Sequence, residues 1–228
     1  MMTRRSPIVT IGLFAAMLGA ISPVRADDAK QGDPQRGAVI AAKGTPAGAA
    51  PCVQCHASDG TPDASGTFPH IGGQSSYYLS EQLHAFSSGA RSNALMSAIA
   101  KQLSADDIAD VAAYYAGLEA PSASPRAGAP DLVRRGQQLA TVGDAQRRIQ
   151  ACNNCHGFAG SGERPAVPYI GGQYAGYIAS QLNMWQQGSR RTSADEMATI
   201  AKLLDASDIS AVAAYYEQAR PPAKEAAK

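Results

Sequence analysis

The sequence predicts an all-α fold made of two similar helical domains. The first observation is a repeat, in which FPHIGGQSSYYLSEQL at residues 68–83 matches VPYIGGQYAGYIASQL at residues 167–182. A second pair repeats in the same order, IAKQLSADDIADVAAYY at 99–115 and IAKLLDASDISAVAAYY at 200–216. A period of about 100 residues is too long for a solenoid and indicates a duplicated domain. Helical periodicity is present in both copies, whereas strand signals are weak, and this favours helices throughout.

The first helix of each copy is expected from its start signal. In copy 1 it begins near Asp33 and Pro34, because aspartate is a good N-cap and proline a good first-turn residue. Its counterpart in copy 2 begins near Asp131. Gly37 and Gly136 lie inside these helices, where glycine costs about 1 kcal/mol relative to alanine. A glycine at this position in both copies predicts close packing of the helix backbone against another helix.

A middle helix is expected after each IGGQ sequence. Apolar residues recur there at the i, i+4, i+7 spacing of one helical face. These residues are Leu79, Leu83 and Phe86 in copy 1 and Ile178, Leu182 and Trp185 in copy 2.

The last helix of each copy has the clearest pattern. A capping pair, Ser104 with Asp107 and Asp205 with Asp208, precedes an apolar face. Each copy is therefore expected to contain three or four short helices joined by loops rich in glycine and proline. The residues of the apolar face are Ile108, Val111, Ala112 and Tyr115 in copy 1 and Ile209, Val212, Ala213 and Tyr216 in copy 2.

Residues 1–26 have the pattern of an export signal. Arg4 and Arg5 precede an uncharged apolar run, and VRA ends at Ala26 as a cleavage site. An uncleaved anchor is the alternative, but the run is shorter than the roughly 20 residues of a spanning helix. We expect cleavage after Ala26 and a periplasmic chain. The expected domain limits are 27–118 for domain 1, 119–131 for a linker, 132–219 for domain 2 and 220–228 for a tail.

Charge is distributed unevenly between the two copies. Residues 27–124 hold 5 basic and 10 acidic side chains, a net charge of −5, and residues 125–228 hold 12 and 9, a net charge of +3. The net charge of the two segments together is only −2, and this argues against nucleic acid as a partner. The residues of copy 2 are therefore expected to lie in a more positive electrostatic field than those of copy 1.

All four cysteines lie in two copies of one motif, CVQCH at residues 52–56 and CNNCH at 152–156. A thioredoxin-like thiol pair needs a βαβ setting that is missing here. Structural zinc sites usually place their cysteine pairs about 12 to 20 residues apart, much closer than these. In c-type haem attachment, two thiols on one helical turn bond to the haem and the next histidine binds the iron. The sequence therefore predicts two covalently bound haem c groups, attached at Cys52, Cys55 and His56 and at Cys152, Cys155 and His156.

The second axial ligand of each iron is expected to be a methionine. Met96 and Met197 occupy matching positions in the two copies. Met184 has no counterpart and lies on a predicted helix, so we assign it to packing. Ligation by two histidines is excluded in copy 2, where His156 is the only histidine. The spare histidines of copy 1 are expected to be ordinary surface or loop residues: His70 and His84.

Each copy resembles a class I cytochrome c domain, and the tandem pair resembles the cytochrome c4 family of di-haem cytochromes. The resemblance covers nearly the whole mature chain, with the haem motif, Pro-x-Ile, GGQ, the methionine loop and AAYY in both copies. It implies two tandem all-α domains, each wrapped around one haem. It also implies that the Pro69 and Pro168 carbonyl groups accept hydrogen bonds from the motif histidines. Six side chains are candidate partners of the haem propionates: Gln74, Tyr77, Arg91, Gln173, Tyr177 and Arg190. The alternative is that these residues form an exposed polar face with no role in haem binding.

Histidine and methionine together leave no open position on the iron, so this ligand set predicts an electron carrier and not an enzyme. The resemblance implies transfer from a quinol-oxidising cytochrome complex to a haem-copper terminal oxidase. Two alternatives stay open. One is a cytochrome subunit of a periplasmic dehydrogenase complex, with a flavoprotein or an alcohol- or sulfur-compound-oxidising enzyme. The other is an enzyme, such as a di-haem peroxidase or a thiosulfate-oxidising cytochrome, which needs an open or labile ligand at one iron.

Overall fold

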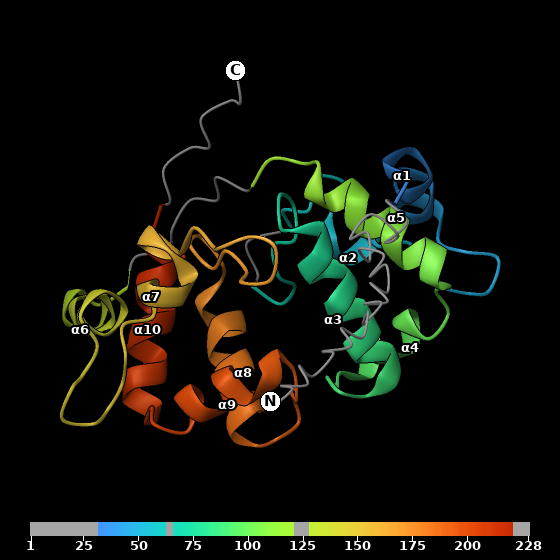
Figure 1. Cartoon of the computed structure of the whole chain (residues 1–228). Helices are drawn as coiled ribbons and strands as arrows, with labels where there is room; N and C mark the ends of the chain where they lie inside the picture. The colour runs from blue at the N-terminus through green and yellow to red at the C-terminus, as the bar shows by residue number, and fades with distance from the viewer. Residues whose placement is uncertain (1–31, 63–65, 121–127, 221–228) are drawn as a thin grey trace, which may run out of the picture. The chain divides into compact units, whose positions relative to one another are not determined.

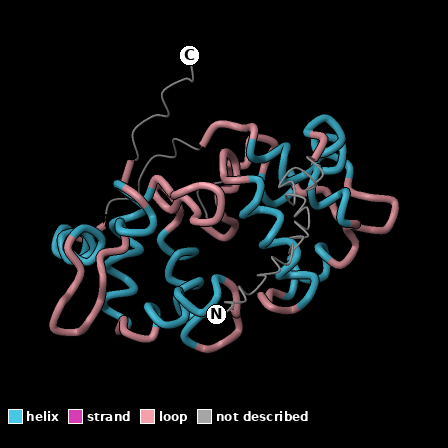
Figure 2. The backbone as a smooth tube through the Cα atoms, in the orientation of Figure 1, coloured by secondary structure: helices cyan, strands magenta, loops and turns pink. Residues whose placement is uncertain are grey.

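The computed structural model describes residues 32–62, 66–120 and 128–220, and the regular secondary structure of these residues is helical. No β-strand occurs among them, only three isolated bridges (Figure 2). The all-α prediction is confirmed. The expected signal, residues 1–26, lies outside the described residues, as do parts of the expected linker and tail. Within the described ranges, no helix is long and apolar enough to cross a membrane.

The two copies contain the same order of helices (Figure 1). Copy 2 has two additional 3-10 turns, η2 (Phe158–Gly160) and η3 (Ser193–Asp195). Copy 1 contains α1 (Pro34–Lys43), α2 (Val53–His56), α3 (Ser76–Ser88), α4 (Ala94–Ala100) and α5 (Ala105–Ala116). Copy 2 contains α6 (Pro130–Thr141), α7 (Asn153–His156), α8 (Ala175–Gln186), α9 (Glu196–Ala201) and α10 (Ala206–Gln218).

The first helix of each copy packs tightly on the last, α1 on α5 and α6 on α10. A Cβ atom added to Gly37 would lie 2.1 Å from the carbonyl oxygen of Asp110. A Cβ atom added to Gly136 would lie 2.0 Å from that of Ala211. Because no side chain fits in such a space, both glycines are needed for the backbone approach, and the predicted close packing is confirmed.

The last helices also match their predicted pattern. α5 begins with a capping box of Ser104 and Asp107, and α10 with one of Asp205 and Asp208. All eight residues of the two expected apolar faces are buried. On the middle helices, Phe86 and the three copy 2 residues are buried, whereas Leu79 and Leu83 are only partly buried.

Among the described residues each copy has five α-helices, where three or four were expected. The additional ones are short, and α2 and α7 have only four residues each. A segment of one turn cannot show a helical repeat in its sequence. The second domain's first helix begins at Pro130, one residue before the expected Asp131, and the proline occupies the favoured first position.

Copy 2 has a buried carboxylate bound by two arginines. Asp208 is 3% exposed, and its oxygens accept hydrogen bonds from Arg135 at 3.0 Å and from Arg147 at 2.5 Å. Burial alone would raise the pKa of Asp208, but the bonds from Arg147, Arg135 and the Asp205 backbone bring this pKa below its ordinary value.

Replacing Asp208 with asparagine is expected to destabilise the protein by about 2 kcal/mol at pH 7. This is less than the ~3–5 kcal/mol of a fully buried pair, because the two arginines are 33% and 37% exposed. An aspartate with a lowered folded pKa stabilises the fold above its unfolded pKa of about 4 and loses that effect as pH falls through the folded value. Urea unfolding of wild type and Asp208→Asn should therefore differ at pH 7 and converge as the pH falls below the lowered folded pKa of Asp208. The control, Asp131→Asn, removes an 88% exposed carboxylate and should change stability by less than ~0.5 kcal/mol. A difference that persists unchanged at low pH would contradict the assignment.

Candidate functional site

Each Cys-x-x-Cys-His motif forms a single helical turn, α2 in copy 1 and α7 in copy 2. The backbone N–H of His56 donates to the carbonyl of Cys52 at 2.9 Å, and His156 makes the same bond to Cys152 at 2.9 Å. Residues three apart on a helix are neighbours on its surface, so the two thiols of each motif lie close together. No disulfide joins the four cysteines, and the described residues contain no cluster of three or more metal-binding side chains. Each turn thus presents the two thiols and the imidazole that a haem c group needs.

The ring of each motif histidine is held by a proline carbonyl in the next loop. Nδ1 of His56 lies 3.1 Å from the carbonyl oxygen of Pro69, and Nδ1 of His156 lies 3.0 Å from that of Pro168. The two expected bonds are therefore confirmed. Burial lowers the pKa of both histidines, although the proline bonds act in the opposite direction, so the rings are neutral at pH 7. A neutral ring that donates from Nδ1 keeps its lone pair on Nε2, the nitrogen available to bind iron.

The two candidate methionines lie on matching short helices. Met96 is on α4, and its backbone N–H donates to the side-chain oxygen of the N-cap residue Asn93 at 2.9 Å. Met197 is on α9 and packs against the hydrophobic core of copy 2. Cys152 packs against the same core, so these two of the four expected haem contacts of copy 2 adjoin one apolar region. Met184 is on α8, as predicted.

Two buried arginines, one from each copy, lie side by side. The backbones of Arg91 and Arg190 form an antiparallel bridge, and the residues are only 4% and 2% exposed. Each guanidinium donates hydrogen bonds to the other copy and to its own. Arg91 donates to Tyr177 at 2.6 Å, Gln181 at 2.7 Å and Gln82 at 2.8 Å, and Arg190 donates to Tyr78 at 3.0 Å, Gln82 at 2.9 Å and Gln181 at 2.9 Å.

This network contains two cations and no described carboxylate. Burial lowers the pKa of Arg190, and Nε of Arg91 is buried without a hydrogen-bond partner among the described residues. A buried charge is costly unless an opposite charge or hydrogen bonds compensate it. The arrangement therefore fits an anionic group, such as the propionates of a haem.

The glutamines of the two GGQ sequences join the copies reciprocally. Gln74 donates to the carbonyl of Tyr169 at 3.1 Å, and its side-chain oxygen accepts from the N–H of that residue at 3.3 Å. Gln173 makes the same pair of bonds with His70, at 2.9 and 3.0 Å. Because each glutamine binds the loop of the other copy, the repeated sequence encodes a two-fold-like contact between the copies.

These positions correct two expectations. The alternative of an exposed polar face is wrong for four of the six propionate candidates, which are buried: Gln74, Arg91, Gln173 and Arg190. Tyr77 is 52% exposed and is not the counterpart of Tyr177. That counterpart is Tyr78, which the analysis of the sequence missed together with Gln82 and Gln181. Aligning the repeat from GGQ onward places Tyr78 opposite Tyr177 and would have identified it.

The spare histidines of copy 1 behave differently from each other. His84 is exposed, as predicted. His70 lies in a loop, one of the two expected placements, but it is only 2% exposed and is therefore not a surface residue. Its ring stacks on Tyr174 with 4.3 Å between the ring centroids, and neither ring nitrogen has a hydrogen-bond partner among the described residues. Burial, the largest effect, lowers the pKa of His70 to about 4, so the ring is neutral at pH 7.

Replacing His70 with phenylalanine is expected to leave the protein equally stable or up to ~1 kcal/mol more stable. The substitution keeps an aromatic ring on Tyr174 and the backbone bonds to Gln173, and it removes two buried polar atoms that lack partners. Thermal unfolding of the haem-loaded protein measures the effect, with His84→Ala as the surface control. A loss of more than 1 kcal/mol would mean that the ring nitrogens have a partner in the loaded protein.

Comparison with known proteins agrees with this geometry. A cytochrome c family model matches residues 41–119. The chain is 36% identical over 172 residues to cytochrome c4 of Pseudomonas aeruginosa. The aligned region covers 74% of this chain and 84% of the relative. It is 38% identical over 168 residues to a thiosulfate dehydrogenase electron acceptor of Stutzerimonas stutzeri, covering 72% of this chain and 77% of that protein. The structure of reduced cytochrome c4 from Pseudomonas stutzeri superimposes with a TM-score of 0.73 at 28% identity, covering 83% of this chain and all of that one.

Two helical copies, each with a haem-attachment turn and a proline-held histidine, define a di-haem c-type cytochrome. Two haem c groups are its covalently bound cofactors, and it functions in electron transfer. The chain belongs to the cytochrome c4 family.

Proposed function

We propose that this protein carries electrons in the periplasm, with His56 and Met96 binding one haem iron and His156 and Met197 the other. The observation that carries the proposal is the repeated arrangement of a buried, neutral histidine held by a proline carbonyl. When bound, each haem supplies one-electron chemistry between ferric and ferrous iron. The chain's residues orient the imidazole, exclude water and surround the propionates with Arg91 and Arg190.

The proposal includes the absence of a catalytic activity of its own. Met96 and Met197 occupy matching positions on α4 and α9, and a methionine at each iron leaves no site for a substrate. The same proposal includes export of the protein through a signal peptide at residues 1–26. It also includes the limits of the parts of the chain: domain 1 at 27–118, a linker at 119–131, domain 2 at 132–219 and a tail at 220–228.

As redox partners we propose a quinol-oxidising cytochrome complex as the donor and a haem-copper terminal oxidase as the acceptor. A second candidate donor is a thiosulfate dehydrogenase, because one relative is a thiosulfate dehydrogenase electron acceptor. The ferric protein should be mixed with each purified donor and its substrate, quinol or thiosulfate. Rapid reduction by only one donor identifies the partner, and a stable complex on co-purification indicates a subunit of a dehydrogenase. Failure of both haems to cycle with any donor and acceptor would contradict the carrier function.

The haem of copy 2 is expected to have the higher reduction potential, by tens of millivolts. Its half of the chain has a net charge of +3 against −5 for the other half. Because salt partly screens charges near a protein surface, we expect this difference in charge to favour reduction of the copy 2 haem by ~1 kcal/mol per electron. A titration that resolves the two haems, with Met96→Ala to identify the copy 1 signal, tests the order. A higher potential in copy 1 would contradict it.

A further inference from the structure

The two copies differ in the loop that leads to the haem-attachment turn. In copy 1 this loop, residues 44–51, contains no charged side chain. In copy 2 the corresponding residues 143–151 include Asp144, Arg147 and Arg148. The charged side chains of this loop therefore alter the protein surface beside the haem-attachment turn of copy 2, and the loop of copy 1 has no counterpart to them.

The loop of copy 2 is held in one conformation. Asp144 and Ile149 exchange two backbone hydrogen bonds, at 2.7 and 2.9 Å. Arg147 ties the loop to α10 through Asp208 at 2.5 Å and also donates to the carbonyl of Leu203 at 2.8 Å. The loop is thus a preorganised surface, which lowers the entropic cost of binding a partner.

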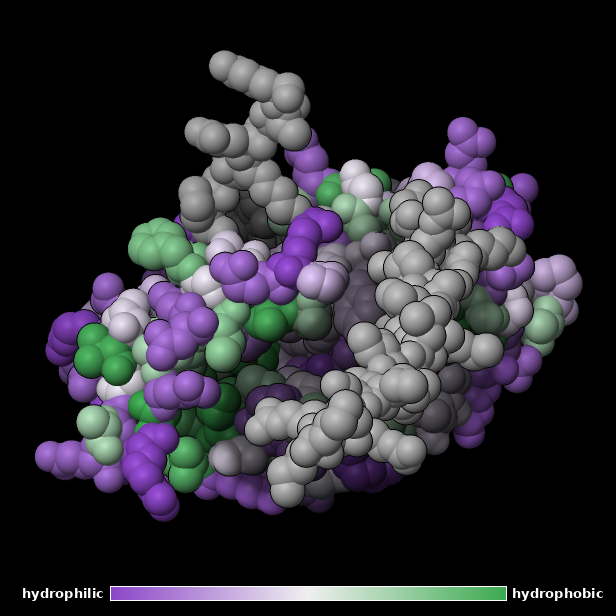
Figure 3. Space-filling model, in the orientation of Figure 1, coloured by the Kyte–Doolittle hydropathy of each residue, from purple (hydrophilic) through white to green (hydrophobic). Residues whose placement is uncertain are grey.

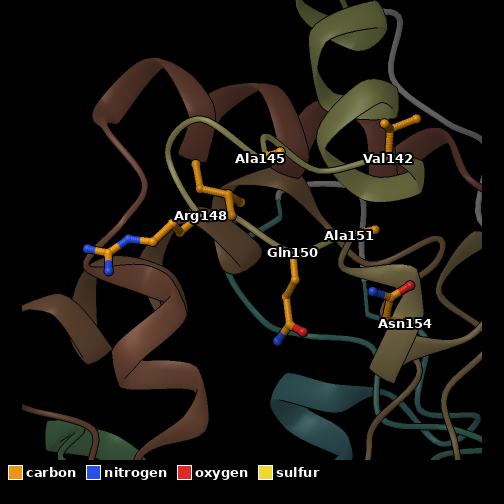
Figure 4. A pocket seen from close by; sticks show the side chains of 7 residues that line it. Val142, Ala145, Arg148, Gln150, Ala151 and Asn154 are labelled. Carbon is orange, nitrogen blue, oxygen red and sulfur yellow. The ribbon is translucent and has the colours of Figure 1, made fainter.

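Arg148 is presented outward by this loop. Its backbone has a φ of 58°, a left-handed conformation that costs an arginine about 1 kcal/mol or more. The side chain is exposed, and it makes no ion pair with any residue that the structure describes. Figure 4 shows its guanidinium directed away from Val142 and Asn154. Arg148 therefore offers an uncompensated positive charge to the solvent.

Beside Arg148 the loop encloses a shallow hollow of about 330 Å³. Asn154 lines the hollow (Figure 4). It lies between Cys152 and Cys155 in the sequence, so the hollow adjoins the haem-attachment turn. Val142 at its edge is 75% exposed. The hollow is lined by Val142, Ala145, Arg148, Ile149, Gln150, Ala151 and Asn154.

A second exposed apolar residue adjoins the same turn. Phe158 begins η2, which packs against α7, and is also 75% exposed. At the matching positions after the motif, copy 1 has Ser58 and Asp59 where copy 2 has Phe158 and Ala159. On the face seen in Figure 3, hydrophobic residues gather on the left of the view, where Figure 1 shows α6, α7 and α10. Copy 2 therefore surrounds its haem-attachment turn with apolar and basic groups, and copy 1 has polar and acidic groups after its motif.

We propose that Val142, Arg148 and Phe158 form a docking patch for a redox protein whose contact face is apolar at its centre and carries carboxylates around it. Charge complementarity selects this occupant, because Arg148 makes no ion pair with any described residue and its half of the chain is positive. The two exposed apolar side chains supply the central contact that excludes water. The inference rests on the proposed carrier function and adds to it that partners dock on copy 2.

The first test locates anion binding without any electron transfer. Hexacyanochromate(III) is a paramagnetic trianion that broadens the NMR signals of amides near the place where it binds. Added to the ferrous, haem-loaded protein, it should broaden amides of residues 142–150 selectively, and the Arg148→Glu variant should lose this effect. Selective broadening at residues 43–50 and 57–60, or an unchanged pattern in Arg148→Glu, would overturn the proposal.

The second test measures docking of a protein. Flavodoxin hydroquinone is an acidic flavoprotein with an exposed apolar flavin edge, and it gives one electron to a ferric haem and becomes the semiquinone. At low ionic strength, Arg148→Glu should slow its second-order reduction of the ferric protein about 5-fold, and Phe158→Ser about 3-fold. The effect of Arg148→Glu should disappear near 0.5 M salt, since screening weakens the attraction between charged surfaces.

The matched control is Lys43→Glu. Lys43 is exposed, ends α1 at the position equivalent to Val142, and gives the same change in charge on copy 1. We expect this variant to change the rate less than 2-fold. An equal or larger effect of Lys43→Glu, or no effect of Arg148→Glu while both haems are still reduced, would overturn the docking patch and leave the carrier function intact. Failure of flavodoxin to reduce either haem in the wild-type protein would instead contradict the carrier function.

Discussion

Replacing Met197 with alanine is expected to lower the reduction potential of the copy 2 haem by about 0.1 V or more and to open its iron to carbon monoxide. Methionine favours ferrous iron and raises the potential, and axial ligands set haem potentials over a range of roughly 0.8 V. Met197 lies on α9 and packs, with Cys152, against the core of copy 2. Redox titration and the visible spectrum under carbon monoxide measure the two effects.

Two other methionine variants separate ligation from packing. Met96→Ala should produce the same changes at the copy 1 haem and leave the copy 2 haem unchanged. Met184→Ala removes the same side-chain atoms from α8 and should alter stability but neither potential. If Met197→Ala keeps its potential and excludes carbon monoxide, Met197 is not the ligand.

Gly136→Ala is expected to destabilise the protein by about 3 kcal/mol or more. The added Cβ would lie 2.0 Å from the carbonyl oxygen of Ala211 and 2.8 Å from Cβ of Tyr215, so α6 would have to move away from α10. Overpacking of a core typically costs ~1–3 kcal/mol, and here the obstacle is backbone, which cannot rotate aside. The gain in helix propensity, about 1 kcal/mol, does not compensate. Urea unfolding of the haem-loaded protein measures the loss.

Alanine substitutions at two further glycines provide a second test and a control for this prediction. Gly37→Ala should be equally harmful, because its Cβ would lie 2.1 Å from the carbonyl oxygen of Asp110. Gly176 lies in the first turn of α8, where an added Cβ has no neighbour within 4 Å, so Gly176→Ala should stabilise the protein by up to ~1 kcal/mol. A cost below 1 kcal/mol for both Gly37→Ala and Gly136→Ala would contradict the close helix contacts.

The long helices were predictable because their signals are local. The capping box of Ser104 and Asp107 and the face that includes Ile108 and Tyr115 can both be recognised within one segment. Gly136 was informative because a mid-helix glycine is costly and needs a compensating contact. The one-turn helices α2 and α7 contain no repeat of the pattern, so only the Cys-x-x-Cys-His spacing indicated them.

The candidate sites were predictable in part. The attachment residues follow from the motif, and the bonds of the histidines to Pro69 and Pro168 followed from the family resemblance. The burial of Arg91, Arg190 and His70 was not predictable, because it depends on contact between segments about 100 residues apart in the sequence. A polar side chain that faces the other copy has the same local sequence signal as one that faces water.

The central claim is that both irons are closed by a histidine and a methionine. Visible absorption of the purified, haem-loaded protein tests it most directly, in the oxidised and reduced states and with and without carbon monoxide. We expect a methionine–ferric band in the far red and no spectral change on adding carbon monoxide. A carbon monoxide shift at one haem would show an open iron, contradict ligation by Met96 or Met197 at that site, and favour an enzyme over a carrier.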